Sequence, residues 1–290
     1  MRIFPQWMRI LGRQEVAIEG VDCRIHDAPD VYRRIVKGIK EHESAVGGLV
    51  TTHKIDLLHA ARDLFDELDP YARELGEISS ISKRDGRLEG HAKDPITVGM
   101  SMKALLGAGY FARTGGQVLI FGAGGSSAAT ILYLLTTPDD ADRPRKIWVV
   151  NRSQERLDAL RTLMDRHTGR VEAELIRNSD PAVNDDILER LPDASLIINA
   201  TGMGKDIPGS PVSLRARFPR SSVAWEFNYR GELDFFRQAA AQRESRGVRV
   251  EDGWLYFLHG WTQVLAQVLH FELSEERFAR LAQSAGAARG

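Results

Sequence analysis

The sequence predicts an α/β protein of two domains, the second of which is a doubly wound parallel sheet. After residue 94, short apolar segments alternate with longer segments of helical periodicity, as in parallel strands that are joined by helices. The chain has 290 residues, of which 43% are hydrophobic and 27% charged, and this composition is sufficient for two packed cores. The segment from residue 254 has only helical periodicity and is expected to return to the first domain.

The chain before residue 94 predicts a smaller α/β domain. Asp85 and Gly86 separate two short segments, and an Asp-Gly pair favours the tight turn of a β-hairpin. Asp27 and Pro29 precede an amphipathic segment and are typical of a helix start. The expected elements are helices over 5–12, 29–40 and 55–68, and strands over 16–25, 48–52, 77–83 and 87–91.

The chain after residue 94 predicts the doubly wound sheet. A helix over 95–109 is expected to end near Gly107 and Gly109, because glycine is common just after a helix. We expect one domain of residues 1–102 with 254–290, and a second of residues 103–253. The expected strands span 117–121, 146–150, 171–176, 195–199, 222–226 and 248–251, and the helices span 126–135, 154–167, 185–191, 233–246, 254–273 and 274–283.

Charge and cysteine content exclude several classes of protein. The formal net charge is -1, whereas nucleic-acid-binding proteins usually carry a basic excess, so we expect no nucleic-acid partner. Cys23 is the single cysteine, which allows neither an internal disulfide nor a cysteine-based metal site, and we expect no metal. The sequence shows no apolar segment of about 18 residues and no signal-peptide pattern. We therefore expect a cytoplasmic protein without a membrane partner, and the sequence leaves a homodimer open.

A glycine-rich turn between the strand over 117–121 and the next helix predicts a nucleotide site. Glycine allows a positive φ and close approach of a pyrophosphate, and the N-terminus of the following helix offers unpaired N–H groups. The alternative is a glycine turn in a doubly wound sheet that binds no nucleotide. We expect the cofactor to contact Gly122, Ala123, Gly124, Gly125, Ser126 and Ser127.

Three polar residues after the next strand indicate which dinucleotide binds. Sites for NAD usually place a carboxylate here, on the ribose 2′-hydroxyl, but this chain has Asn151, Arg152 and Ser153. The guanidinium of Arg152 suits a 2′-phosphate, and Ser153 adds a hydroxyl group. The sequence therefore predicts NADP in a Rossmann domain, and the alternative is an arginine that ends the strand exposed to water.

A polar loop follows the strand over 195–199. Ligands of doubly wound sheets bind at the carboxyl ends of the strands, which is where this loop begins. We expect it to line the nicotinamide, the alternative being a plain exit from the strand. The residues concerned are Ala200, Thr201, Gly202 and Met203.

With these motifs the chain resembles the shikimate dehydrogenase family over nearly its whole length. The glycine turn, the Asn-Arg-Ser segment, the loop after Asn199 and the segment from Glu226 to Tyr229 occur in the family's order. The segment that ends at Lys54 stands where the family has its catalytic lysine. The segment that ends at Asp94 stands where the family has Gly-x-Asn-Thr-Asp.

The resemblance implies a catalytic pair of Lys54 and Asp94 at the mouth between the two domains. Reduction of a ketone by hydride produces an alkoxide that needs a proton, and a lysine beside a carboxylate can supply it. Asp94 also has a structural explanation as a helix N-cap, whereas a positive charge at a helix start is unfavourable for Lys54. The resemblance further implies substrate contacts from Thr51, Ser79, Tyr229 and Gln263.

Several departures from the family concern the substrate. The family holds its substrate's carboxylate on two serines after the very first strand. That strand is expected to be absent here, unless the true start lies upstream of Met1. Ser79 and Ala92 stand where the family has asparagines, and Lys93 adds a charge beside Asp94.

Further departures lie near the end of the chain. Gly231 and Asp234 stand where a proline and a threonine are usual, and Gln267 competes with Gln263 as the substrate-binding glutamine. His53 and His259 flank the catalytic and substrate positions and are expected to contribute packing or surface, the alternative being a histidine that acts as the acid.

The leading hypothesis is an NADP-dependent oxidoreductase that reversibly reduces a cyclic keto acid such as 3-dehydroshikimate. One alternative is the same chemistry on a different polyol or hydroxy acid, such as quinate, because the substrate positions are altered. Another is a sensor that binds NADP or a ligand without turnover. Lys54 and Asp94 oppose the sensor, because a binding-only protein has no need for such a pair.

Overall fold

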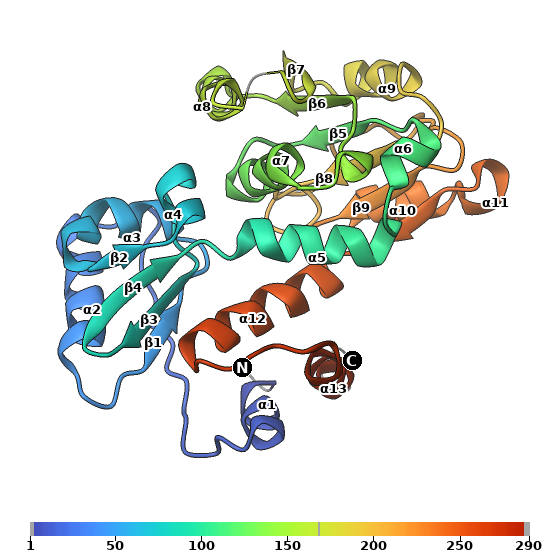
Figure 1. Cartoon of the computed structure of the whole chain (residues 1–290). Coiled ribbons are helices and arrows are strands. Elements are labelled where there is room, and N and C mark those ends of the chain that lie inside the picture. The colour runs from blue at the N-terminus through green and yellow to red at the C-terminus, as the bar shows by residue number, and fades with distance from the viewer. Residues whose placement is uncertain (1–2, 168, 287–290) are drawn as a thin grey trace. The chain divides into compact units, whose positions relative to one another are not determined.

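The computed structural model describes residues 3–167 and 169–286, and the chain divides into two compact units (Figure 1). The first unit comprises the chain up to Lys93 together with the segment from Leu258, and the second comprises Asp94–Phe257. One unit contains a mixed sheet and the other a parallel sheet. The predicted α/β class, with C-terminal helices that return to the first unit, is confirmed.

The second unit contains six described strands in one parallel sheet. They are β5 (Val118–Phe121), β6 (Lys146–Asn151), β7 (Glu172–Arg177), β8 (Leu196–Asn199), β9 (Val223–Glu226) and β10 (Arg249–Glu251). Their order is β10-β9-β8-β5-β6-β7, so the chain builds outward from β5, first on one side and then on the other. This is the order of dinucleotide-binding sheets, in which ligands bind where the direction of building reverses.

Helices cover both faces of this sheet. Val118 and Ile120 belong to one apolar core and Leu119 and Phe121 to the other, because successive strand residues point to opposite faces. Burial on both faces explains why the residues of the central strand β5 are all apolar. The first core includes residues of α5 (Asp94–Leu106), α6 (Tyr110–Thr114), α7 (Gly125–Thr136) and α8 (Gln154–Asp165), and the second includes residues of α9 (Pro181–Glu189) and α10 (Asp234–Ala240). The remaining helices here are η2 (Asp140–Asp142) and α11 (Arg243–Arg246).

The first unit contains a four-stranded mixed sheet in the order β1-β3-β4-β2. The strands are β1 (Gly47–Leu49), β2 (Glu67–Leu68), β3 (Ser80–Arg84) and β4 (Arg87–His91). The predicted hairpin is confirmed: β3 and β4 pair antiparallel, and Asp85 and Gly86 both have positive φ, as the tight turn requires. Helices α2 (Pro29–Glu41), α3 (Lys54–Ala61), η1 (Arg62–Leu64) and α4 (Pro70–Leu75) accompany the sheet.

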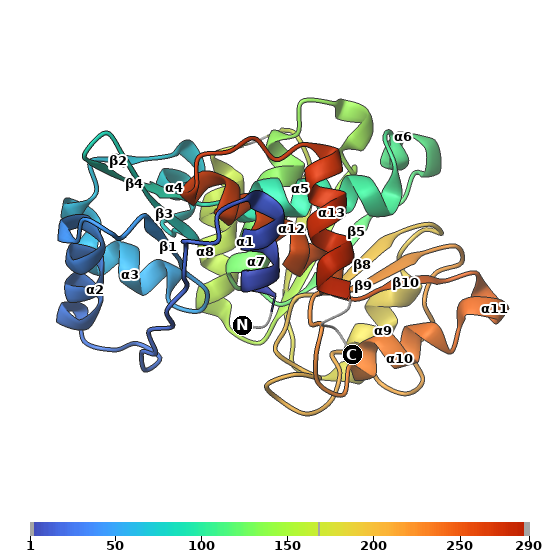
Figure 2. The same ribbon diagram turned by 90° about the horizontal axis from the view of Figure 1, so that it is seen from below.

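Three further helices complete the chain. They are α1 (Phe4–Leu11), α12 (Trp254–Val268) and α13 (Glu275–Gly286). Figure 2 shows α1 beside α13, and the buried Trp7 joins them, because its indole N–H donates to the Leu281 carbonyl at 2.8 Å. The ring of Trp7 also meets that of Trp261 edge to face, with centroids 6.4 Å apart. The C-terminal helices are therefore fixed to the start of the chain.

Two predicted elements of the first unit are wrong. Residues 16–25 form no strand: their apolar side chains are mostly exposed, Val21 by 62% and Ile25 by 64%, so the alternation reflects no buried face. The helix expected over 55–68 ends at Ala61, and the chain then forms η1 and the short strand β2. Among the described residues, no helix combines the length and apolar character that crossing a membrane requires.

Candidate functional site

The glycine turn after β5 is held against two neighbouring strand ends. Gly122 has a φ of 107°, and its N–H donates to the Val150 carbonyl at 2.8 Å. A Cβ atom at Gly122 would lie 2.7 Å from the carbonyl oxygen of Ala200. Only glycine satisfies both the positive φ and this close approach. The turn therefore has the backbone geometry that a dinucleotide-binding loop needs.

The start of α7 fits a pyrophosphate. Gly124 is the N-cap residue, and no side chain caps the first N–H groups of the helix. A Cβ atom at Gly124 would meet nothing within 4 Å, so the glycine faces open space rather than packed protein. Uncapped N–H groups and the positive end of the helix dipole attract an anion. Ala123, Gly125 and Ser126 belong to the same turn and the start of this helix.

Ser127 has a different position from its neighbours. It is fully buried, and its hydroxyl donates to the Gly122 carbonyl at 2.9 Å. This hydrogen bond stabilises the glycine turn from the buried side. Its contact with the cofactor stays a prediction.

The residues after β6 present a cation to solvent. Arg152 is exposed and bonds to no other described residue. Asn151 donates from its side-chain nitrogen to the Ser153 carbonyl at 3.2 Å, and the Ser153 hydroxyl caps α8 by accepting from the Arg156 N–H at 3.4 Å. The guanidinium is thus left available to a phosphate, while its two neighbours shape the loop.

The loop after β8 is held by side chains rather than by regular structure. The Asn199 side-chain oxygen accepts from the Thr201 hydroxyl at 2.6 Å and from the Thr201 N–H at 3.1 Å. The Thr201 hydroxyl in turn accepts from the Met203 N–H at 3.2 Å. Ala200 continues the strand, because its N–H donates to the Phe121 carbonyl at 2.8 Å. The Gly202 carbonyl accepts from the Asp206 N–H at 2.8 Å and closes the turn that follows. This loop therefore lies at the same sheet edge as the glycine turn.

A buried carboxylate joins this loop to the end of β9. Glu226 accepts from the Asn199 side chain at 2.7 Å and from both the backbone and side-chain N–H groups of Asn228, at 2.9 and 2.7 Å. Asn228 also donates to the carbonyls of Thr201 and Met203. Burial raises the pKa of the Glu226 carboxyl to about 7, although its amide donors favour the charged form. The sequence prediction did not include Asn199, Glu226 or Asn228 among the site residues; their signal is polarity at the ends of buried strands.

Two predicted substrate contacts, with the predicted catalytic lysine, lie in the first unit. Lys54 begins α3, and its carbonyl accepts from the Ile78 N–H at 3.3 Å. Ser79 is buried, and its hydroxyl accepts from the Lys93 N–H at 2.8 Å, which leaves the hydroxyl proton to be donated. Thr51 is exposed before α3.

Two further predicted residues lie in the second unit. Asp94 is the first residue of α5 and is 9% exposed. Tyr229 is exposed, with its ring centroid 4.7 Å from that of Phe257 and 6.1 Å from that of Trp254. Because Lys54 and Asp94 belong to different units, their pairing stays a prediction.

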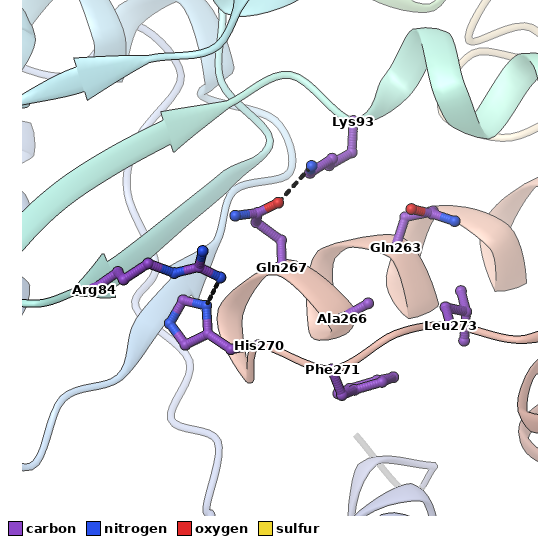
Figure 3. Close-up of a pocket in the computed structure, with 8 residues that line it drawn as sticks. All are labelled: Arg84, Lys93, Gln263, Ala266, Gln267, His270, Phe271 and Leu273. Carbon is purple, nitrogen blue, oxygen red and sulfur yellow. Dashed lines mark hydrogen bonds between the residues drawn. The ribbon is translucent and has the colours of Figure 1, made fainter.

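A cavity of the first unit contains both candidate glutamines. Gln263 and Gln267 extend from α12 into it, and the Lys93 ammonium donates to the Gln267 side-chain oxygen at 2.6 Å (Figure 3). Ala92, by contrast, is fully buried in the apolar core. Of the two residues before Asp94 that differ from the family segment, Ala92 therefore packs in the core and Lys93 lines the cavity.

The second unit has the strand order and a glycine turn that are typical of a dinucleotide-binding domain, and comparison with known proteins identifies the family. No protein-family profile matches the chain. A shikimate dehydrogenase (NADP(+)) of Methylobacterium radiotolerans is 30% identical over 260 residues, which are 89% of this chain and 82% of that protein. The chain therefore belongs to the shikimate dehydrogenase family, a family of oxidoreductases, and the prediction from its motifs is confirmed.

Solved structures share the fold over nearly the whole chain. The crystal structure of shikimate dehydrogenase from Aquifex aeolicus has a TM-score of 0.70 at 20% identity and covers 97% of this chain and 92% of that one. Quinate dehydrogenase from Corynebacterium glutamicum, in complex with NAD, has a TM-score of 0.70 at 19% identity and covers 99% of this chain and 93% of that one.

Proposed function

We propose that the protein is an NADP-dependent dehydrogenase that interconverts a cyclic hydroxy acid, such as shikimate, and the corresponding keto acid. The observation that carries this proposal is the glycine turn of the second unit, with Gly124 before an uncapped helix start. The anion-binding turn supplies the place for a dinucleotide, and membership of the family supplies the reaction class.

The cofactor is NADP. The Methylobacterium radiotolerans relative is named for NADP(+), and this chain has an exposed guanidinium at Arg152 where an NAD site usually has a carboxylate. Gly122 and Gly124 would receive the pyrophosphate, and Arg152 the 2′-phosphate. When bound, NADP would supply a hydride acceptor for the carbinol carbon in its oxidised form and a hydride donor in its reduced form.

The chain's own residues handle the proton of this reaction. As the carbinol carbon loses its hydride, the neutral Lys54 amine takes the hydroxyl proton, and a carbonyl group forms. In the reverse direction the Lys54 ammonium gives a proton to the developing alkoxide. Asp94 would orient the amine and stabilise its charged form. The domain roles follow: residues 1–102 with 254–290 bind the substrate, and residues 103–253 bind the cofactor.

The substrate contacts come from hydroxyl and amide groups. The Ser79 hydroxyl retains a proton that can be donated to a ring hydroxyl, and Gln263 lines the cavity of the first unit. Thr51 and the Tyr229 hydroxyl are exposed and would complete the set. A second candidate substrate is a quinate-like acid, which is favoured by the added charge of Lys93 in the cavity of the first unit.

The test is a substrate panel that is followed at 340 nm. The wild-type protein with NADP⁺ should form NADPH with shikimate or with quinate. Lys54→Ala should lower kcat about 10²- to 10⁴-fold, the usual effect of a lost acid–base group. Lys37→Gln removes an exposed lysine from α2 and is the matched control, so its kcat should stay at the wild-type value.

Two outcomes would contradict the proposal. Tight NADP binding without turnover of any cyclic hydroxy acid would leave a ligand-binding sensor. Full activity of Lys54→Ala would remove Lys54 from the reaction, whereas a drop in both lysine variants would indicate a general loss of charge or folding.

A further inference from the structure

A basic cavity lies in the first unit between the β3–β4 hairpin and α12. Its volume is about 420 Å³, which lies within the usual range of small-molecule sites. Every lining residue belongs to the first unit. They are Arg84, Lys93, Gln263, Ala266, Gln267, His270, Phe271 and Leu273 (Figure 3).

The lining that the structure describes contains two basic side chains, Lys93 and Arg84, and no carboxylate. Lys93 stands at one end of the cavity, and Arg84 stands at the other with His270 (Figure 3). Two carboxylates lie near Lys93, those of Glu89 and Asp69, and both have partners within the protein. Glu89 lies near His91, at 3.3 Å, and accepts from the Ser82 hydroxyl at 3.4 Å. The cavity is therefore electropositive along its length.

Asp69 is the other carboxylate that acts on Lys93. It accepts from the backbone N–H groups of Ala72 and Ala92, at 2.7 and 3.2 Å, and lies 3.7 Å from His91. These bonds hold Asp69 as the N-cap of α4 and away from the lining. Asp69 is therefore not among the described residues that line the cavity.

At the Lys93 end, the side chain of Gln267 is oriented by the ammonium. The bond of 2.6 Å uses the carboxamide oxygen, so the NH₂ group of Gln267 turns away from Lys93 (Figure 3). That NH₂ group donates to no other described residue. Gln263 extends from α12 one turn earlier, on the same side. The ammonium and the amide NH₂ group together match the two oxygens of a carboxylate.

At the opposite end, a hydrogen-bond chain fixes Arg84. The Arg84 guanidinium donates to His270 Nδ1 at 2.9 Å, and His270 Nε2 lies 2.7 Å from the Lys83 carbonyl. This arrangement fits a neutral imidazole that accepts at Nδ1 and donates at Nε2. Arg84 is therefore directed along the cavity and adds positive potential there, at a distance from the Lys93 end.

Lys93 is itself an unusual residue for a cavity wall. Burial lowers the pKa of its ammonium, and Asp69 and Glu89 offset that effect only in part. A ligand carboxylate beside the ammonium would favour the charged form and regain part of the lost solvation. Lys93 also directly precedes Asp94, the proposed partner of the catalytic lysine.

We infer that this cavity binds the carboxylate of the substrate, with Lys93 as the principal contact and Gln267 as the second. This assignment rests on the dehydrogenase function proposed above, whose substrate is a cyclic hydroxy acid. It makes Lys93 a specificity-determining residue that distinguishes acids from neutral cyclic polyols. Arg84 attracts the anion and is not its principal ligand.

The test compares an acid with its ester. Initial rates with NADP⁺ are measured for shikimate and for its methyl ester, which has the same ring without the negative charge. Lys93→Gln should raise KM for shikimate about 10- to 100-fold, the effect of losing a charge-assisted hydrogen bond, and leave kcat within about threefold. KM for the methyl ester should stay unchanged. Lys93→Arg should recover most of the affinity for the acid.

Calorimetric titration with shikimate makes the binding measurable without turnover. If shikimate binds in a way that depends on Lys93 but is not converted, the assignment of the carboxylate to this cavity is supported and the proposed dehydrogenase function is contradicted. Turnover in which Lys93→Gln raises KM for acid and ester alike would overturn the cavity and keep the dehydrogenase function. Lys37→Gln, the exposed-lysine control, should change neither KM. A wild-type protein that neither binds nor converts shikimate and quinate would overturn both.

Discussion

The two units differ in how their functional residues are held. In the second unit, the loops of the proposed cofactor site leave the carboxyl ends of parallel strands, and Glu226 connects two of these loops by accepting hydrogen bonds from Asn199 and Asn228. In the first unit, the sheet has short strands, and Lys93 and Gln267 meet across 174 residues of sequence. Backbone geometry therefore shapes the proposed cofactor site, whereas individual side chains shape the proposed substrate site.

The largest expected effect concerns the glycine turn. Gly122→Ala would place a Cβ atom 2.7 Å from the Ala200 carbonyl at a positive φ, and should destabilise the second unit by about 4 kcal/mol through backbone strain and overpacking. Gly124→Ala is the matched control for folding, because its Cβ atom meets open space. It should leave the unfolding free energy nearly unchanged and weaken NADP binding. Urea unfolding and fluorescence titration with NADPH measure the two effects.

Equal stability of the two alanine variants would contradict the geometry given for Gly122. Unchanged NADPH affinity of Gly124→Ala would contradict the placement of the pyrophosphate at the start of α7.

The next effect is a difference between the two units in how the unfolding free energy depends on pH. Burial raises the pKa of Glu226 to about 7 from an ordinary 4.5, so the folded state binds the proton more tightly. The resulting stabilisation is complete below about pH 4.5 and is lost as the pH rises through about 7. Its size is on the order of 3 kcal/mol. Glu226→Gln should therefore remove much of the alkaline fall in the unfolding free energy. If the unfolding free energy of the variant falls by the same amount, the raised pKa of Glu226 is not the cause of the alkaline fall.

His259 in the first unit should show the opposite dependence. It is buried against the Phe278 ring, with centroids 4.1 Å apart, and burial lowers its pKa from 6.5 to about 4. The unfolded chain binds the proton more tightly, so the stabilisation is complete above about pH 6.5 and is lost as the pH falls through about 4. His259→Leu should flatten this acid limb, again on the order of 3 kcal/mol. Urea midpoints across pH 4–8 test both variants together.

The smallest expected effect concerns cofactor choice. Arg152→Ala should weaken NADP binding about 10- to 100-fold and leave NAD binding unchanged, because only NADP carries the 2′-phosphate. Arg156→Ala removes an exposed arginine from the first turn of α8 and should have little effect. Titration of each variant with both cofactors gives the comparison. Equal losses for NADP and NAD would place Arg152 elsewhere than at the 2′-phosphate.

The sequence predicted the second unit more completely than the first. The strands β5, β6 and β8 have apolar centres, β5 is followed by a glycine turn, β6 and β8 end at asparagines, and these signals are local. The strand expected over 16–25 was wrong because alternation alone cannot show whether Val21 and Ile25 meet a buried face. The roles of Glu226 and Gln267 depend on hydrogen-bond partners that are distant in sequence. The local sequence around each residue therefore could not predict these roles.

The most direct test measures KM for NADP⁺ and KM for shikimate side by side in Arg152→Ala and Lys93→Gln, from initial rates at 340 nm. If the two units hold separate halves of the site, Arg152→Ala will raise KM for NADP⁺ alone and Lys93→Gln will raise KM for shikimate alone, each at least about 10-fold. If either variant raises both values by the same factor, the division of the site between the two units is contradicted.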